Sequence, residues 1–202
     1  MTALLSTTFF GPVQWYQKLL RYGNVMIEAH ESFTKQTYRN RCLIATAQGV
    51  QALTVPVVHD DAGGDISTLR ISSHGNWRHQ HWQALTSAYG DSPFLEYYED
   101  DLRPFFADDR WERLIDYNED IRRTVCSLID ISPAVGYTDD YVRDASHADF
   151  RAAIRPKQPA PDPEFTAKPY YQVFAQRHGF MPNLSILDLL LNMGPEAVFY
   201  LL

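Results

Sequence analysis

The chain has 202 residues, of which 45% are hydrophobic and 21% charged, and it carries a formal net charge of -7. A chain of this length buries enough apolar surface to fold without disulfides or a structural metal. The negative charge argues against general binding to a nucleic-acid backbone, so we expect no nucleic-acid partner, although a local basic patch is compatible with it.

The cysteines and the N-terminus indicate the cellular compartment. Cys42 and Cys126 are far apart and fit no metal-ligand spacing, which is typical of buried thiols in a reducing compartment. The N-terminus lacks a basic leader, and no stretch reaches about 18 uninterrupted apolar residues. We therefore expect a cytoplasmic protein without a signal peptide or a membrane span.

The beginning of the chain predicts a strand, a helix and a second strand. Leu4 to Phe10 favours a strand. Pro12 suits the first position of a helix, and apolar residues then repeat at helical spacing from Val13 to Leu20. Gly23 ends this helix, and Val25 to Ala29 indicates the second strand. A short unit of this kind favours a parallel crossover connection.

A hairpin is predicted next. Tyr38 to Thr46 and Val50 to Val58 indicate two strands that meet near Gln48-Gly49. His59 to Asp65 is rich in Asp and Gly and predicts a loop, and Leu69 to Ser72 indicates one more short strand. We expect one mixed sheet that contains four segments: Leu4–Phe10, Val25–Ala29, Cys42–Ala45 and Ala52–Val57.

Apolar residues at helical spacing then predict a helical half of the chain. One helix runs from Trp77 to Ala88, and Ser92-Pro93 opens another. Asp109 is placed to cap a third helix, whose apolar stripe continues from Trp111 to Ile129. A further helix is indicated around Asp139 to Ile154.

Residues 155–169 contain five of the twelve prolines, which predicts an extended and mobile stretch. Beyond it, Ser185 to Asp188 has the form of a capping box before an apolar helix that Gly194 would end. The segment 170–202 is too short for an independent core, so we expect it to dock on the main body. The sequence thus predicts one α/β domain over 1–202, with a mixed sheet, an N-terminal strand–helix–strand unit, a hairpin and a following helical half.

The densest polar cluster is the run from Lys35 to Arg41, which includes Gln36 and Asn40. It follows Glu28 and His30, which share one face of a strand by their spacing of two. Ligands of open α/β sheets bind beyond the carboxyl ends of strands, near a change in strand order. These residues are therefore candidates for a binding site. The alternative is that they only solvate the edge of a sheet.

His81 has two interpretations. It lies four residues after Trp77, on the apolar face of its helix, where a buried histidine needs a hydrogen-bond partner. It is then either a satisfied core residue or a general base that faces a cleft. Together with His74 and His79 it suggests zinc, but residues two apart on a helix do not face each other. We expect no metal site and no cofactor.

Three further residues could carry chemistry. Asn118 interrupts an apolar helix stripe and is satisfied either by the backbone of the fold or by a ligand. Asp188 is explained as a capping residue. Cys42 has no histidine placed by the sequence to activate it as a nucleophile.

Several short stretches follow one another in an order that resembles the WbqC family. They are Phe9 to Pro12, Val25 to His30, Lys35-Gln36 with Asn40-Arg41, Leu53 to Pro56, Trp77 with His81, Ala88-Tyr89 with Ser92-Pro93, Asn118, Tyr171 to Phe174 and Asn183 to Leu190. The middle helices and the Pro-rich stretch do not take part. The resemblance implies a role in bacterial O-antigen and surface-polysaccharide biosynthesis, and no particular reaction.

From the residues and the resemblance together we expect a transferase that acylates or aminoacylates an amino-sugar precursor. His81 or His30 would be the base, and the donor would be an acyl or aminoacyl compound or a carrier protein. The alternative is a non-catalytic protein that binds a carrier or partner in the same pathway. The expected substrate-binding residues are Glu28, Lys35, Gln36, Asn40, Arg41, Trp77, Tyr89 and Asn118.

Overall fold

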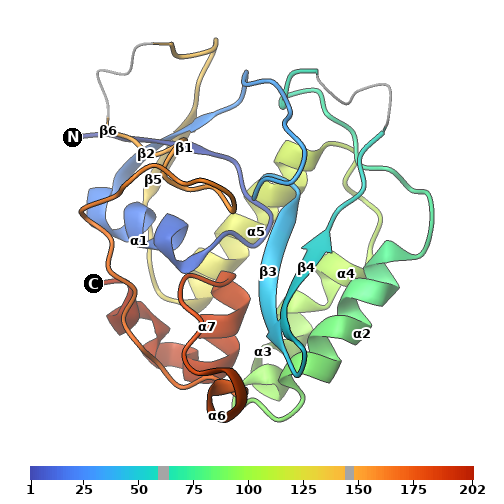
Figure 1. The fold of residues 1–202 in the computed structure, drawn as a ribbon. Helices are drawn as coiled ribbons and strands as arrows, with labels where there is room; N and C mark the ends of the chain where they lie inside the picture. Colours follow the sequence, from blue (N-terminus) through green and yellow to red (C-terminus); the bar gives the residue numbers. More distant parts are fainter. Residues whose placement is uncertain (59–63, 144–147) are drawn as a thin grey trace.

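The computed structural model describes residues 1–58, 64–143 and 148–202 (Figure 1). One sheet has the strand order β5-β2-β1-β6, and its strands are all parallel. Its members are β1 (Ala3–Ser6), β2 (Asn24–Glu28), β5 (Ala134–Tyr137) and β6 (Ala148–Asp149). The chain adds β2 and β5 on one side of β1 and then returns to add β6 on the other. The strand order therefore changes direction between β1 and β6.

Helix α1 (Val13–Tyr22) connects β1 to β2 and confirms the predicted strand–helix–strand unit. It begins directly after Pro12 and ends at Gly23, whose φ of 67° suits a residue without a side chain. All seven residues from Val13 to Leu19 are buried, including Lys18. A helix that packs on a sheet normally has one face in solvent. Burial of seven consecutive residues shows that other segments of the chain cover α1 on the side away from the sheet.

The hairpin of β3 (Arg41–Thr46) and β4 (Gly49–Thr54) is confirmed, but the expectation that it joins the first sheet is wrong. The free edge of β3 is occupied by other partners. The carbonyl of Leu43 accepts the N–H of Ser185 at 2.8 Å, and the N–H of Ala45 donates to the Tyr89 hydroxyl at 3.1 Å. Because these groups are already satisfied, β3 has no edge left for pairing with β1 or β2.

The helical half contains α2 (Trp77–Tyr89), α3 (Leu95–Leu102), α4 (Pro104–Ala107) and α5 (Leu114–Leu128). The predicted cap at Asp109 is wrong, because α5 starts after Arg113, and Trp111 packs on Phe105 from the loop before the helix. The predicted helix from 139 to 154 is also wrong for the part that the structure describes, which contains β6 instead. Most of the predicted loop His59–Asp65, namely 59–63, lies outside the described residues.

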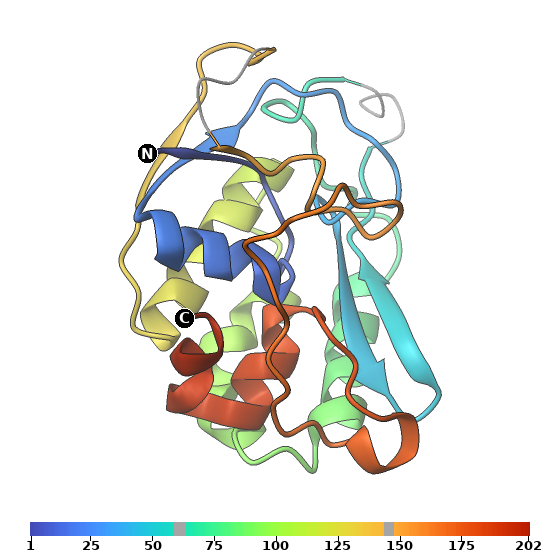
Figure 2. The same ribbon diagram turned by 60° about the vertical axis from the view of Figure 1, so that its left-hand side comes forward.

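The Pro-rich stretch has neither helix nor strand over 155–169 and crosses in front of α1 (Figure 2). Asp162 contacts the buried Lys18 ammonium at 2.8 Å, which explains why that side of α1 is covered. After it come α6 (Ala175–His178), α7 (Ile186–Met193) and the 3-10 helix η2 (Gly194–Tyr200). Ser185 caps α7 and Gly194 ends it, as predicted. The Asp188 carboxylate caps nothing and turns inward, as described below.

Candidate functional site

Polar side chains gather where the parallel strands end. Ser6 is the last residue of β1, Glu28 is the last residue of β2, and Arg151 lies two residues after the end of β6. Carboxyl ends of parallel strands share one edge of a sheet, and the edge at a change of strand order is where open α/β folds bind ligands. The residues at this edge divide into those that hold the fold together and those that face a cavity.

Glu28 belongs to the first group. It is fully buried, and its carboxylate accepts four hydrogen bonds at 2.9 to 3.0 Å. The donors are the His30 and Val142 backbone N–H groups, the Thr138 hydroxyl and the Arg151 guanidinium. Arg151 in turn binds Asp149 and the Val142 carbonyl. Glu28 therefore ties the ends of β2, β5 and β6 together and has no lone pair left for a ligand.

A second buried ion pair lies beside the first. Arg39 binds Glu31 through both Nε, at 2.7 Å, and one terminal nitrogen, and both side chains are more than 90% buried. The Ser6 hydroxyl donates to Glu31 at 3.1 Å and accepts from Arg39 at 3.3 Å. Such a bidentate pair fixes the guanidinium in one orientation. Arg39 is thus held at the end of β1, on the border of two cavities.

The first cavity is a narrow crevice between the ends of β1 and β6. It holds about 10 Å³, room for about one water molecule. Its wall carries many hydroxyl groups. The Thr8 hydroxyl is buried and has no hydrogen-bond partner, which is costly unless a small ligand group or water meets it. The crevice is lined by Ser6, Thr7, Thr8, Trp15, Thr37, Tyr38, Arg39, Arg151 and Ile154.

The second cavity adjoins the crevice, since Thr37 and Arg39 line both. It holds about 200 Å³, and we call it the basic pocket. Its lining contains four cations and no carboxylate, in a chain whose net charge is -7. Gln36 at its rim binds the Lys157 ammonium at 2.6 Å. The lining residues are Thr34, Lys35, Gln36, Thr37, Arg39, Arg155, Pro156 and Lys157.

His30 lies just beyond the end of β2 and faces Asp65. Its Nδ1 is 3.0 Å from the Asp65 carboxylate, and its side chain is 29% exposed. The hydrogen bond to Asp65 raises the pKa of His30 above its ordinary value. A carboxylate at Nδ1 favours the tautomer with the proton there, which leaves Nε2 as the basic atom. This pair has the arrangement of an oriented general base.

The other predicted binding residues have partners within the fold. The Asn40 amide donates to the Val55 carbonyl at 2.8 Å, and Arg41 donates to the Thr54 hydroxyl at 3.0 Å. Asn118 is buried and donates to the Thr7 hydroxyl and the Arg39 carbonyl, so it joins α5 to the end of β1. The fold thus satisfies the amide nitrogen of Asn118, whereas its buried Oδ1 has no hydrogen-bond partner.

Tyr89 belongs to a buried network around Asp188. Its hydroxyl donates to Asp188 at 2.7 Å, and Tyr170 and Gln172 donate to the same carboxylate at 2.7 Å each. Burial raises the pKa of Asp188, although these hydrogen bonds oppose the rise. The network connects α2 and the hairpin to the C-terminal segment. It explains why the Asp188 side chain turns away from its own helix terminus.

His81 is surrounded by aromatic rings. Its ring centroid lies 5.2 Å from Trp77 and 6.1 Å from Phe9, and the residue is 8% exposed. Burial lowers the pKa of His81 to about 4, and its Nδ1 has no hydrogen-bond partner. The lining of the basic pocket does not include it. This placement favours the core interpretation of His81 over the general base.

The structure gives less support to a cysteine nucleophile, a metal site or a membrane span. Both cysteines are free and buried, and burial raises the pKa of Cys42 to about 12 and that of Cys126 to about 11, so neither is an activated nucleophile. Within the described residues, no group of three His, Cys, Asp or Glu side chains is placed to hold a metal ion. No helix in the same part of the chain is long and apolar enough to cross a membrane.

Sequence reasoning identified Lys35 and Gln36 but missed most of their neighbours. Arg39 lies inside the cluster that was singled out, and its position between polar neighbours could have indicated it. The prolines around Arg155 and Lys157 predict only that these two residues lie in an extended stretch. No local signal shows that they lie beside Gln36, which is 121 residues away from Lys157.

Comparison with known proteins identifies relatives of this chain. The model of the WbqC-like protein family matches residues 7–160, a region that includes every residue of the basic pocket and stops before α7. The uncharacterized protein Rv1507c of Mycobacterium tuberculosis is 26% identical over 194 residues, covering 84% of this chain and 83% of the relative. No solved structure matches the chain.

Proposed function

This chain belongs to the WbqC-like protein family, and from that premise we propose that it is a transferase of bacterial surface-polysaccharide (O-antigen) biosynthesis. Its substrate is an amino-sugar precursor that carries a phosphate, and its reaction is acylation or aminoacylation of the amine. The phosphate binds in the basic pocket, and the amine is presented to the neighbouring edge of the parallel sheet.

The basic pocket is the observation that carries this proposal. Four cations converge there from two segments of the chain, and Arg39 is fixed by its ion pair with Glu31. The other three, Lys35, Arg155 and Lys157, are exposed, and the hydrogen bonds that Arg155 and Lys157 form are to neutral oxygens of Arg151 and Gln36. A solvated surface of an acidic protein would be expected to intersperse charges of both signs. Phosphate is the anion that such a set of Lys and Arg side chains recognises best.

Backbone strain at the rim supports a role for this loop in binding. Gln36 has a φ of 62°, in the left-handed region that costs a residue with a side chain about 1 kcal/mol. Strained residues of this kind concentrate at ligand sites, where the surrounding structure holds them in place. Gln36 also meets Lys157 from the opposite wall, so the strained residue closes the pocket.

His30 is the proposed base for the transfer step. Its Nε2 accepts a proton from the substrate amine while the amine nitrogen attacks the carbonyl carbon of the acyl donor. A C–N bond forms, the bond from the acyl carbon to its leaving group breaks, and the leaving group departs with the electron pair. Hydroxyl donors of the crevice, such as Thr8, would stabilise the negative charge on the carbonyl oxygen.

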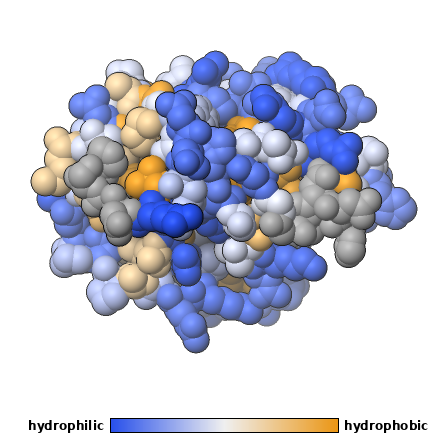
Figure 3. Space-filling view, turned by 90° about the horizontal axis from the view of Figure 1, so that it is seen from above, coloured by the Kyte–Doolittle hydropathy of each residue, from blue (hydrophilic) through white to orange (hydrophobic). Residues whose placement is uncertain are grey.

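The second candidate is a non-catalytic protein that binds a carrier or partner in the same pathway. A partner surface of that kind would expose a continuous apolar patch. The face reached by the loops at the top of Figure 1 is mainly hydrophilic, with apolar residues in small areas (Figure 3). This observation favours a small polar ligand on that face.

The test is a mass-spectrometric screen of the purified protein against phosphorylated and nucleotide-linked amino sugars with acyl and aminoacyl donors. A mass increase of one acyl group on the sugar supports the proposal. Lys35→Gln and Arg155→Gln should each raise KM for the sugar about tenfold, because each removes a charge-assisted hydrogen bond. Lys168→Gln is the matched control, since its ammonium contacts only backbone carbonyls near the C-terminus.

Two results would overturn the proposal. One is the absence of any product together with the absence of binding to inorganic diphosphate. The other is a product whose KM is unchanged in both pocket variants. Binding of the sugar without turnover, weakened by Lys35→Gln, would favour the non-catalytic candidate.

A further inference from the structure

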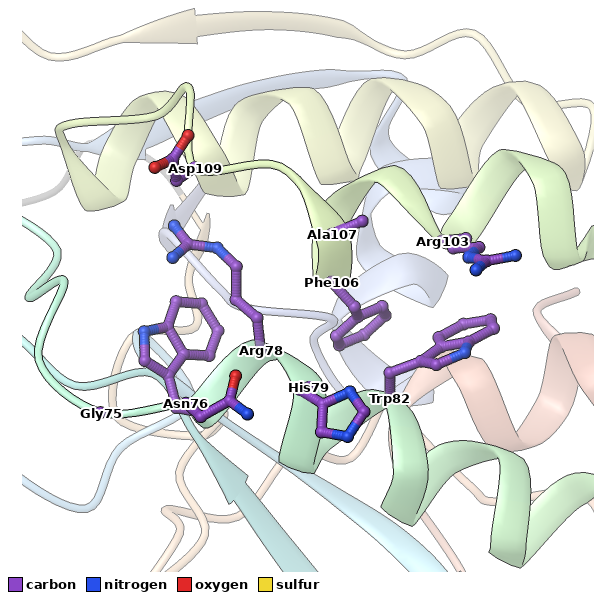
Figure 4. A pocket seen from close by; sticks show the side chains of 10 residues that line it. Gly75, Asn76, Arg78, His79, Trp82, Arg103, Phe106, Ala107 and Asp109 are labelled. Carbon is purple, nitrogen blue, oxygen red and sulfur yellow. The ribbon is translucent and has the colours of Figure 1, made fainter.

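We infer that a third cavity, between α2 and α4, is a binding site for a nucleoside diphosphate. It holds about 480 Å³, a volume typical of small-molecule sites, and it shares no residue with the basic pocket. The inference does not depend on the proposed function. We call this site the α2–α4 cavity, and it is lined by Gly75, Asn76, Trp77, Arg78, His79, Trp82, Arg103, Phe106, Ala107 and Asp109 (Figure 4).

Arg78 is a cation held in place without a counter-charge. Its guanidinium lies 4.3 Å from the centroid of the Trp77 ring, and its Nε is buried without a hydrogen-bond partner. Arg78 forms no ion pair among the described residues, although the Asp109 carboxylate lines the same cavity (Figure 4). By contrast, Arg113 and Arg122 each pair with an acidic neighbour. A guanidinium fixed by stacking and lacking its own anion is suited to bind one from outside.

The floor of the cavity is aromatic. The Trp82 ring lies 5.7 Å from Phe106 at an angle of 37°, and Trp82 is only partly buried. Figure 4 shows Phe106 and Trp82 between Arg78 at one end and Arg103 at the other. A flat ring can therefore stack on Trp82, as nucleobases do on exposed aromatic side chains at about 1 to 3 kcal/mol per base.

Arg78 and Arg103 indicate that the ligand also carries acceptor atoms and negative charge. Arg103 is 62% exposed and has one weak contact, 3.6 Å to Glu99, so its remaining donors are available. A nucleoside diphosphate combines a flat ring, carbonyl or ring-nitrogen acceptors on the base, and a doubly charged tail. It therefore matches an aromatic floor with one guanidinium at each end. A purely apolar ligand would leave both arginines without partners.

The experiment is isothermal titration calorimetry of the full chain with UDP and with ADP. We expect at least one of them to bind. Trp82→Leu, Arg78→Gln and Arg103→Gln should each weaken that binding about tenfold. Arg110→Gln is the matched control, because Arg110 also stacks on a tryptophan, Trp111, at 4.3 Å, yet does not line the cavity. Arg103 is exposed, so its variant tests the site even if Arg78→Gln fails to fold.

Lys35→Gln separates this site from the basic pocket. Nucleotide binding that survives Lys35→Gln and is weakened by Arg103→Gln and Trp82→Leu supports the α2–α4 cavity, whatever the fate of the transferase proposal. The inference is overturned if neither nucleotide binds at millimolar concentration. It is also overturned if either Arg103→Gln or Trp82→Leu leaves the affinity unchanged, or if only Lys35→Gln lowers it.

Discussion

His81 makes the stability of the protein depend on pH. In the folded state its pKa is about 4, whereas an exposed histidine in the unfolded chain titrates near 6.5. Between these values the unfolded state binds more protons, so stability falls as the pH falls. We expect this residue alone to remove up to about 3 kcal/mol between pH 7 and pH 4.

Urea denaturation of the wild type and of His81→Gln at pH 7.5 and pH 4.5 measures how much His81 contributes to the pH dependence of the free energy of unfolding. The variant keeps a polar side chain at the position but cannot titrate. The wild type should lose about 2 kcal/mol more than the variant over this interval. Equal losses would mean that His81 is solvated in the native state and free to act in a site.

The pKa of His30 is shifted in the opposite direction, because the hydrogen bond to Asp65 raises it by more than burial lowers it. As a base it works only when unprotonated, so the transferase rate should rise with pH through the raised pKa. His30→Ala should lower kcat about 100-fold or more.

Asp65→Asn removes the carboxylate that raises the pKa of His30. In the pH profile of kcat, the acid limb should therefore move to lower pH, and the plateau should fall. A profile unchanged by Asp65→Asn would contradict the assignment of His30 as the base.

At the scale of elements, α1 depends on a contact with a segment about 140 residues away. Its Lys18 ammonium is fully buried and is neutralised by Asp162, with the Phe150 ring 4.3 Å away. Asp162→Ala should destabilise the protein by about 3 kcal/mol, because the buried ammonium then keeps only the partly exposed Glu164 carboxylate, 3.6 Å away. The double variant Lys18→Met with Asp162→Ala removes both charges and should recover most of that loss in chemical denaturation. If the single variant costs less than about 1 kcal/mol, water reaches Lys18 and the stretch does not cover α1.

The Pro-rich stretch itself should still be mobile. Only a few of its amides donate to backbone or side-chain acceptors, among them Ala160 and Phe165, and its prolines have none to donate. Hydrogen exchange over 155–168 should therefore be fast in the free protein. Arg155 and Lys157 line the basic pocket, so a phosphorylated sugar at saturating concentration should slow exchange around them. Slow exchange without ligand would contradict the mobility, and unchanged exchange with ligand would exclude a lid.

At the scale of the whole molecule, the main hydrophobic core contains residues from Ala3 to Leu201, and a small second cluster joins Ala45 of the hairpin to Met181 and Leu184 of the C-terminal segment. Helix α7 contributes seven consecutive buried residues, from Ile186 to Asn192, and the Asp188 network joins it to α2. We therefore expect the full chain to unfold in one cooperative transition, with coincident far-ultraviolet and near-ultraviolet melting curves. A chain truncated after residue 169 should not fold. Two resolved transitions, or a folded truncated chain, would show that 170–202 is a separate unit.

The α/β class and much of the local structure followed from the sequence alone. The helix between Pro12 and Gly23, the hairpin near Gln48 and the helix from Ser185 to Gly194 were predicted with nearly correct limits. In each case the signal is local. Proline, glycine and serine restrict the backbone where they stand, and the spacing of apolar residues sets which face is buried.

Only the tertiary structure decided which partners those elements choose. The hairpin lies outside the parallel sheet because Ser185 and Tyr89 occupy the edge of β3, and neither is near it in sequence. The same holds for the candidate site, where Lys35 was predicted but Arg155 and Lys157 were not. Hydrogen bonds and charges are satisfied by whatever group the folded chain brings within reach. Residue types alone therefore show that Glu28 and His81 need partners. The fold gives Glu28 structural partners, whereas it encloses His81 among aromatic rings and leaves its Nδ1 without one.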